Sequence, residues 1–392
     1  PADRFARSFP ALAVAENQPT WLVRIKNRMT SLSTLADACE AVTTFITRCN
    51  ESPPAVDFDQ LALGLFGFQF TQNKAYANLC QSEKRTPDTV THWEEIPAVP
   101  TRAFKSFDIT VLPEADRQTV FRSSGTTHSN RSRHLHNSAT LSVYEASLWS
   151  WFNEHIVDEA VGRLLFLFPK PSEAPESSLC KMMGAVAKHL AKREHFFAAD
   201  AQWQIDGQAT IDFLHDATTQ NESVTALGTA FSFVHLLDFM EAENIELRLP
   251  AGSAAMETGG YKGRSREVAK PELHSAIVDR LGILPERILC EYGMCELSSQ
   301  AYDGKLGQAN PAPRLFRFPP WARARVVSPE TLDEVAPSQA GLLEITDLAN
   351  VGSALCVLTE DLAKRYEDGF ELLGRAEPTE SRGCSLMNLN HA

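Results

Sequence analysis

The stretch Arg287-Ile288-Leu289-Cys290 is followed directly by Glu291-Tyr292-Gly293-Met294-Cys295-Glu296. Its first half is a short apolar run, which is typical of a buried strand in a parallel sheet. Its second half places an aromatic ring, a glycine and a carboxylate just after that strand. Open α/β sheets bind their ligands beyond the carboxyl ends of the strands. The stretch therefore predicts an α/β sheet with a ligand site near Glu296.

A second segment, Ser123-Ser124-Gly125-Thr126-Thr127, follows the apolar residues Thr119-Val120-Phe121. Small residues let backbone N–H groups converge on an anion, and the hydroxyl groups add donors around phosphate oxygens. The segment lacks the Gly-x-x-x-x-Gly-Lys-Ser/Thr pattern of a P-loop. Together the two segments predict a nucleotide site in which Glu296 holds a magnesium ion, because hard cations prefer oxygen ligands.

Composition narrows the class of protein. The 392 residues are 43% hydrophobic, enough for one large α/β domain or two ordinary ones. The net charge of −13 argues against a nucleic-acid-binding surface. No apolar run reaches the roughly 18 residues that a membrane span needs.

The start of the sequence lacks a signal-peptide core, and the eight cysteines show no Cys-x-x-Cys spacing. We therefore expect a cytoplasmic protein with reduced thiols. We interpret His128, His134 and His136 as residues of a polar loop rather than metal ligands.

Helix-like spacing covers residues 31–50 and 57–82, and a phosphate loop is expected at 121–133. Helix and strand patterns then alternate, which predicts parallel strands joined by right-handed crossovers. The expected helices are Ser138–Phe152 (with Ser138 as N-cap), Ser177–Arg193, Phe233–Glu243 and Pro271–Leu281, and the expected strands are Leu164–Phe168, Val224–Phe231, Leu247–Leu249 and Arg287–Glu291. After residue 314 shorter strands are expected at Arg323–Val327, Leu342–Thr346, Ala354–Leu358 and Phe370–Leu373.

These patterns divide the chain into four parts. Residues 1–95 form an N-terminal helical region, and residues 96–313 form an α/β nucleotide-binding core. A β-rich subdomain follows at 314–375, and residues 376–392 form a short tail that contains Cys384.

The chain resembles the acyl-protein synthetase (LuxE-type) family, within the adenylate-forming superfamily. The resemblance runs in family order from about residue 96 to 386. Its motifs are Ile96–Pro100 with Phe104-Lys105, Phe121–Thr127, Ser177-Ser178-Leu179, Gly259-Gly260-Tyr261-Lys262, Glu291–Gln300 and Arg382-Gly383-Cys384. It implies the large N-terminal domain of an adenylate-forming enzyme, with parallel α/β sheets and a β-rich subdomain.

The resemblance also implies a role for each motif. Ser123, Ser124, Gly125, Thr126 and Thr127 would bind the phosphates of ATP, and Glu296 would bind Mg²⁺. Tyr292 would stack on the adenine, which Gly259 and Gly260 would line, and Gly293 would belong to the same nucleotide-binding set. Asp361 would accept hydrogen bonds from the ribose, and Arg375 would reach the ribose or a phosphate.

Three features depart from the wider superfamily pattern. Cys295 stands where a threonine hydroxyl bonds the α-phosphate, and a thiol is a poorer donor. The usual Thr-Gly-Asp is Thr359-Glu360-Asp361. After Arg375 only the tail follows, so the mobile C-terminal domain and its lysine are expected to be absent. Lys262 is the nearest candidate for that charge, with an exposed structural lysine as the alternative.

The expected enzyme is an acid–thiol ligase that forms an acyl-adenylate from a fatty acid and ATP. The family's Arg-Gly-Cys pattern implies that Cys384 then accepts the acyl group as a thioester, to feed an acyl reductase. An acyl-donor thioesterase is a second possible partner. Two alternatives stay open: transfer to coenzyme A or a carrier-protein thiol, and a weakened acyl- or nucleotide-binding subunit of a larger complex.

Overall fold

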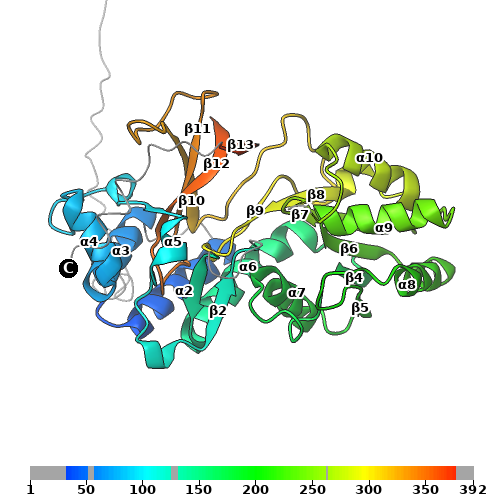
Figure 1. The fold of residues 1–392 in the computed structure, drawn as a ribbon, viewed down its shortest axis with the longest axis horizontal. Coiled ribbons are helices and arrows are strands. Elements are labelled where there is room, and N and C mark those ends of the chain that lie inside the picture. The colour runs from blue at the N-terminus through cyan, green and yellow to red at the C-terminus, as the bar shows by residue number, and fades with distance from the viewer. Residues whose placement is uncertain (1–31, 52–56, 125–130, 262–263, 377–392) are drawn as a thin grey trace, which may run out of the picture.

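The computed structural model describes residues 32–51, 57–124, 131–261 and 264–376. Two sheets organise these residues (Figure 1). The six-stranded sheet has the order β5 (His195–Phe197), β4 (Arg163–Leu167), β6 (Val224–Thr229), β7 (Ala254–Thr258), β8 (Ile288–Tyr292) and β9 (Ala301–Tyr302). Its first five strands are parallel, and β9 is antiparallel to β8. The predicted parallel α/β sheet is therefore confirmed.

Helices cover both faces of this sheet (Figure 1). Successive side chains of a strand point to opposite faces. In β4, Phe166 accordingly packs with α6 (Ser138–Ile156) and α7 (Ser178–His189). Its neighbours Leu165 and Leu167 pack instead with α8 (Gly207–Thr219), α9 (Ala230–Ala242) and α10 (Lys270–Leu281).

The second sheet has five strands, in the order β1 (Val99–Pro100), β12 (Cys356–Tyr366), β11 (Ala340–Asp347) and β10 (Ala322–Val327), with β13 (Gly369–Arg375) also paired to β12. Strand β1 pairs in parallel with β12, so the sheet recruits residues from before the β-rich region predicted at 314–375. Its core includes side chains of α2 (Leu35–Glu51), α3 (Phe58–Gln72) and α4 (Lys74–Ser82). Asn73 separates α3 from α4, because its side chain caps the second helix by accepting from the Tyr76 N–H.

In the part of the chain that the structure describes, a two-stranded hairpin and four short helices lie outside the two large sheets and the long helices. Strands β2 (Thr119–Arg122) and β3 (Arg133–His136) form an antiparallel hairpin, so both ends of the loop expected at 121–133 are strands. The short helices are α5 (Ala103–Ser106), η1 (Trp93–Glu95), η2 (Glu114–Asp116) and η4 (Pro285–Arg287). Within the described residues, every helix is too short or too polar to cross a membrane.

Several predicted boundaries are wrong. Leu247–Leu249 is not a strand; its Leu247 and Leu249 N–H groups donate to the Arg280 and Leu281 carbonyls at the end of α10. The neighbouring strand is instead β7, which was not predicted.

Three helix ends also differ from the prediction. The strand expected to reach Phe231 ends at Thr229, whose hydroxyl accepts from the Ser232 N–H and caps α9. The N-cap of α6 is Asn137 rather than Ser138, because the Asn137 side chain accepts from the Thr140 N–H. Helix α7 ends at His189 rather than Arg193.

Candidate active site

The β2–β3 hairpin carries the predicted phosphate loop. At its described base, the Ser123 hydroxyl oxygen accepts the Ser132 N–H at 3.0 Å, and the Arg131 side chain donates to the Ser123 carbonyl. Ser124 is exposed. Gly125, Thr126 and Thr127 lie outside the described residues, so phosphate binding by this loop stays a prediction.

Two predicted segments meet at the carboxyl edge of the six-stranded sheet. Gly259 and Gly260 follow β7, and Tyr292 and Gly293 lie at the end of β8. The register pairs Thr258 with Glu291, which places Gly259 beside Tyr292. Gly259 has φ +67°, in the left-handed region that favours glycine. A Cβ at Gly293 would clash with the Glu291 carboxylate as it is placed, so that side chain would have to shift.

Tyr292 joins this edge to the second sheet. Its hydroxyl donates to Asp361 Oδ2 at 2.8 Å, and Arg375 Nε lies 3.7 Å from Asp361 Oδ1. Burial raises the pKa of Asp361, while the Tyr292 hydrogen bond opposes that shift. Burial also raises the pKa of Tyr292, as does the Asp361 charge, so the tyrosine stays a neutral donor. The structure therefore brings together Tyr292, Asp361 and Arg375, which the sequence had proposed separately.

The Tyr292 ring packs edge-on against three phenylalanines. Its centroid lies 6.0 Å from that of Phe316, 6.2 Å from Phe318 and 5.8 Å from Phe370. Tyr292 is only 7% exposed, so these contacts fix the ring and leave little of its surface uncovered. Stacking of Tyr292 on adenine stays a prediction.

Cys295 and Glu296 lie next to each other in a buried turn. The Cys295 thiol donates to Glu296 Oε2 at 3.2 Å, so the side chain that replaces the family threonine contacts the proposed metal ligand. Glu296 is 5% exposed, and its carbonyl accepts from Asn350 Nδ2 at 2.9 Å. One carboxylate fits magnesium, because Mg²⁺ in nucleotide sites takes its remaining ligands from phosphates and water.

Sequence reasoning missed two residues that hold this turn. Asp347 accepts from the Ser298 and Ser299 N–H groups at 2.9 and 2.8 Å. Asp347 is the last residue of β11, and Asn350, in the loop that follows, donates to the Glu296 carbonyl. An Asp and an Asn at the end of a predicted strand indicate a turn. They do not predict which distant segment the turn contacts.

The interpretation of two histidines as polar-loop residues is wrong. His134 and His136 lie in β3 and are 1% and 2% exposed. His134 Nδ1 lies 2.8 Å from the Cys295 carbonyl oxygen. His128 lies outside the described residues, as do the proposed catalytic residues Lys262 and Cys384.

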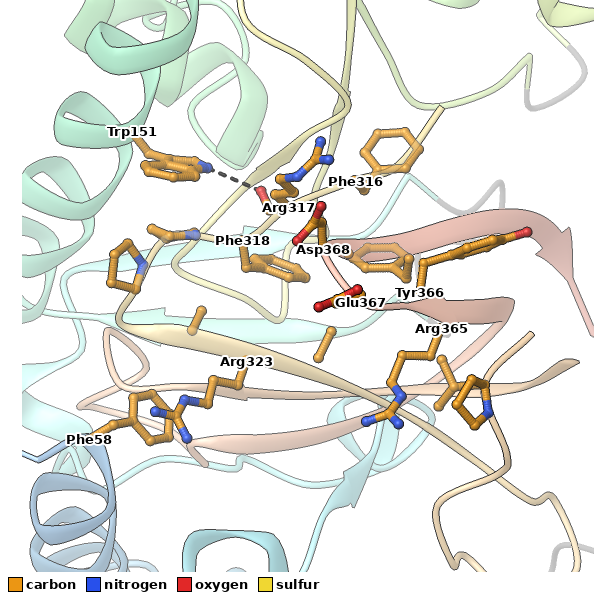
Figure 2. A pocket seen from close by; sticks show the side chains of 18 of the residues that line it. Phe58, Trp151, Phe316, Arg317, Phe318, Arg323, Arg365, Tyr366, Glu367 and Asp368 are labelled. Carbon is orange, nitrogen blue, oxygen red and sulfur yellow. Dashed lines mark hydrogen bonds between the residues drawn. The ribbon is translucent and has the colours of Figure 1, made fainter. Parts of the chain in front are cut away.

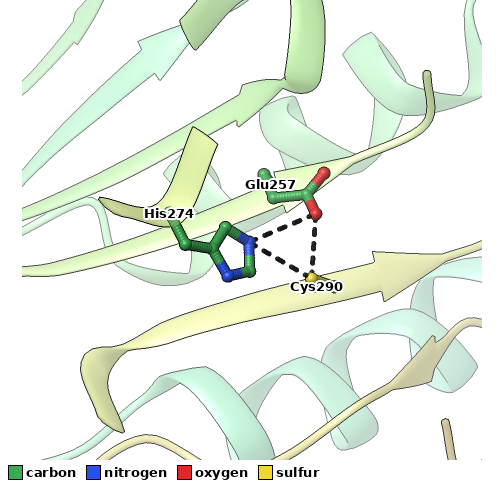
Figure 3. Close-up of side chains that lie close together, drawn as sticks. All are labelled: Glu257, His274 and Cys290. Carbon is green, nitrogen blue, oxygen red and sulfur yellow. Dashed lines mark hydrogen bonds and ion pairs between the residues drawn. The ribbon is translucent and has the colours of Figure 1, made fainter. Parts of the chain in front are cut away.

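A further cluster has the composition of a metal site. Glu257 of β7, Cys290 of β8 and His274 of α10 point toward one another (Figure 3). Cys290 Sγ lies 2.8 Å and His274 Nε2 3.5 Å from Glu257 Oε1. Lys270 Nζ, however, lies 2.9 Å from the same oxygen, and Arg314 Nη1 lies 2.9 Å from His274 Nδ1. A guanidinium can only donate, so Nδ1 is the acceptor and Nε2 carries the ring proton. His274 Nε2 then has no lone pair for a metal, and Lys270 supplies the positive charge.

A groove of about 1400 Å³ is lined in part by the phenylalanines that contact Tyr292 (Figure 2). It is lined by aromatic and arginine side chains, among them Phe58, Trp151, Phe316, Phe318, Arg323 and Arg365. None of the described site residues predicted from sequence lines it. Because the motifs predicted to bind the nucleotide converge at Tyr292 and Asp361, we place the candidate site there rather than in the groove.

Comparisons with known proteins identify the family of this chain. The profile of the acyl-protein synthetase (LuxE) family matches residues 55–392. A long-chain-fatty-acid–luciferin-component ligase of Aliivibrio fischeri is 24% identical over 352 residues, covering 85% of this chain and 88% of the relative. A ligase of the same name from Vibrio harveyi is 21% identical over 344 residues, covering 83% of this chain and 86% of the relative.

Solved structures show the fold. A 2-hydroxyisobutyryl-CoA ligase in its postadenylation state, in complex with 2-HIB-AMP, superimposes with a TM-score of 0.60 at 15% identity, covering 83% of this chain and 72% of that one. The same ligase in complex with 2-HIB-AMP and CoA also gives 0.60, at 16% identity, covering 84% and 70%. The chain therefore belongs to the acyl-protein synthetase (LuxE) family of acid–thiol ligases, and its fold is that of the adenylate-forming enzymes.

Proposed function

We propose that this protein activates a fatty acid with ATP and Mg²⁺ as an acyl-adenylate and then transfers the acyl group to its own Cys384. The names of the Aliivibrio and Vibrio relatives support a long-chain fatty acid as substrate. In the proposed pathway an acyl reductase consumes the thioester, and a thioesterase that releases acyl groups supplies the acid.

The hydrogen bond between Tyr292 and Asp361 carries the proposal. The motifs proposed to bind adenine and ribose come from two different sheets and meet there at 2.8 Å, beside Gly259. A nucleoside bound at this edge would have its ribose at Asp361 and its base along Gly259 and Gly260. Its phosphates would extend toward the β2–β3 hairpin, because His134 of that hairpin contacts Cys295.

In the first step, a carboxylate oxygen of the fatty acid attacks the α-phosphorus of ATP, and pyrophosphate leaves. Ser123–Thr127 would donate hydrogen bonds to the phosphates and hold them in line with the attacking oxygen. Glu296 would ligate Mg²⁺, which supplies positive charge to the triphosphate when bound. The Cys295 thiol, bonded to Glu296 Oε2, would help to orient that carboxylate.

In the second step, the Cys384 thiolate attacks the acyl carbonyl, a thioester forms and AMP leaves. The described chain ends at Ala376, one residue after Arg375, which pairs with Asp361. An extended chain advances at most about 3.6 Å per residue, so residues 376–384 can span no more than about 30 Å. A tether of this length that begins beside Asp361 would allow Cys384 to visit the proposed adenylate, which supports it as the acceptor.

Two variants test the proposal with ATP and radiolabelled fatty acid. Wild-type protein should carry a labelled, hydroxylamine-labile band on a denaturing gel. Cys384→Ser should still form acyl-adenylate, measured by pyrophosphate exchange, but should carry no such band, because a serine hydroxyl without a base is a weak nucleophile. Glu296→Gln should lose about a hundredfold in exchange, about 3 kcal/mol of transition-state stabilisation.

Three other outcomes would contradict all or part of this proposal. A labile band that persists in Cys384→Ser would contradict the tail as acceptor. Label that moves to added coenzyme A would identify a diffusible thiol as the acceptor. Wild-type protein that neither exchanges pyrophosphate nor becomes labelled would contradict the enzymatic proposal.

A further inference from the structure

We propose that His134 is a positioning residue that sets the distance between the hairpin bearing the phosphate loop and the turn bearing Glu296. This inference rests on the proposed function, because it assumes that both segments bind one triphosphate. His134 would act through the Cys295 backbone and would not itself touch the nucleotide.

The geometry defines the hydrogen bond. His134 is 1% exposed, and its Nδ1 lies 2.8 Å from the Cys295 carbonyl oxygen. A carbonyl oxygen can only accept, so Nδ1 must carry the proton. Burial lowers the pKa of His134 to about 4, although the hydrogen bond to Cys295 opposes this shift. The ring is therefore neutral near pH 7, with its proton on Nδ1.

On one side, His134 is joined rigidly to the base of the loop. Strand β3 pairs His134 with Phe121 and Arg133 with Arg122. The ladder continues to Ser123, whose N–H and hydroxyl oxygen both bond the Ser132 backbone. Movement of His134 would therefore move the start of the loop with it.

On the other side, the bonded carbonyl belongs to the residue directly before Glu296. The turn that follows is anchored to the second sheet, where Asn350 binds the Glu296 carbonyl and Asp347 binds the Ser298 and Ser299 N–H groups. The His134 bond thus ties the hairpin to a turn that is already fixed. Two groups that grip one ligand from opposite sides need a set separation, and an error of about 1 Å can cost a hundredfold in rate.

His136 provides a matched control in the same strand. It is 2% exposed, and its ring centroid lies 4.2 Å from that of His134. Its Nδ1 bonds the nearby Thr140 hydroxyl at 3.2 Å, a contact within the same local segment. Substitution of His136 therefore disturbs the same buried layer while leaving the bond to Cys295 in place.

Asparagine and glutamine separate the hydrogen bond from the packing. The Asn Nδ2 atom lies the same number of bonds from Cα as His Nδ1, so His134→Asn keeps the donor, whereas His134→Gln moves it one bond further out. We expect His134→Gln to raise the KM for ATP in pyrophosphate exchange by about three- to tenfold, the effect of one neutral hydrogen bond. His134→Asn should stay within about twofold of wild type, and His136→Gln should leave the KM for ATP unchanged even if it lowers the melting temperature.

Other results would overturn the inference. It fails if His134→Gln and His136→Gln change the KM for ATP equally, or if His134→Gln changes only the melting temperature. If the variants do not fold, the wild-type protein still tests the hydrogen bond by NMR. The ¹⁵N resonances of the His134 ring should show a neutral imidazole protonated on Nδ1. Protonation on Nε2 would refute the bond to the Cys295 carbonyl.

If wild-type protein shows no pyrophosphate exchange, the proposed function fails instead, whatever the ring nitrogens of His134 report. If Glu296→Gln leaves exchange intact, the magnesium role of Glu296 fails, because adenylation then proceeds without that carboxylate.

Discussion

Replacement of Tyr292 by phenylalanine isolates the contact that joins the two sheets. The change removes one hydroxyl group and keeps the ring among Phe316, Phe318 and Phe370. Asp361 then loses a donor at 2.8 Å while remaining largely buried, with 17% of its side chain exposed. We expect a loss of folding stability that depends on the charge of Asp361.

The magnitude follows from the type of bond. A hydrogen bond to a charged group contributes about 1.5–3 kcal/mol. Partial exposure lets water replace some of the lost bond, so we expect about 1.5 kcal/mol at pH 7. For a chain of 392 residues this loss lowers the melting temperature by about 2 °C. Urea unfolding and thermal melting of the two proteins measure it.

The pH dependence has a definite sign. Burial holds the pKa of folded Asp361 above its usual value, and loss of the Tyr292 donor raises that pKa further. The penalty is therefore largest where Asp361 is ionised, and it shrinks as the pH falls through the folded pKa. The loss should be smaller at pH 4.5 than at pH 7.

A control and a cycle complete the experiment. Tyr366→Phe removes a similar bond, from Tyr366 to Glu371 at 3.0 Å, at the other end of the β12–β13 hairpin, and should cost less at both pH values. A double-mutant cycle with Asp361→Ala should return a coupling of about 1–2 kcal/mol at pH 7. A coupling near zero, or a loss that does not vary with pH, would refute the contact with ionised Asp361.

Three further predictions concern the neighbouring groups. Cys295→Thr should maintain pyrophosphate exchange or raise it at most about tenfold, because a hydroxyl is a better donor than a thiol; a large loss would show that the thiol has its own role. Burial opposes ionisation of Glu257, but Lys270, His274 and Cys290 outweigh it and lower the Glu257 pKa to about 2. Glu257→Gln should therefore destabilise the fold by about 1–3 kcal/mol at pH 7, and the difference seen in urea unfolding should diminish as the pH falls from about 4.5 toward 2. Zinc or EDTA should leave the wild-type melting temperature unchanged, because His274 Nε2 carries a proton; a metal-dependent rise would contradict the assigned tautomer.

The strand that was missed shows where local pattern misleads. Leu247-Arg248-Leu249 has the alternation of a strand, yet Leu247 and Leu249 are buried in a connection that bonds the end of α10. Strand β7 contains Glu257, a residue that is rarely buried without a partner. Lys270 supplies that partner from α10. A buried carboxylate whose partner comes from a separate helix gives no strand signal in a short window of sequence, so the pattern of neighbouring residues did not predict β7.

The sequence by itself determined the alternation of parallel strands and helices, and it predicted the chemistry of the motifs. Apolar runs such as Leu164–Phe168, spaced by amphipathic segments, predicted parallel strands covered by helices, since burial on both faces is a local property of composition. Small and hydroxyl residues at 123–127 and the carboxylate of Glu296 likewise predicted which segments suit phosphate and magnesium.

Only the tertiary structure decided which of these segments meet. Tyr292 bonds Asp361 across 69 residues, and His134 bonds Cys295 across 161. The pairing of β1 with β12 likewise joins segments about 258 residues apart, since Val99 pairs with Val357. A hydrogen bond between distant segments forms only when whole sheets and helices pack so that its donor and acceptor meet. Most of the free energy for that packing comes from burial of the core, and the net contribution of one hydrogen bond is small. The neighbours of the two residues in sequence therefore do not determine whether the bond forms.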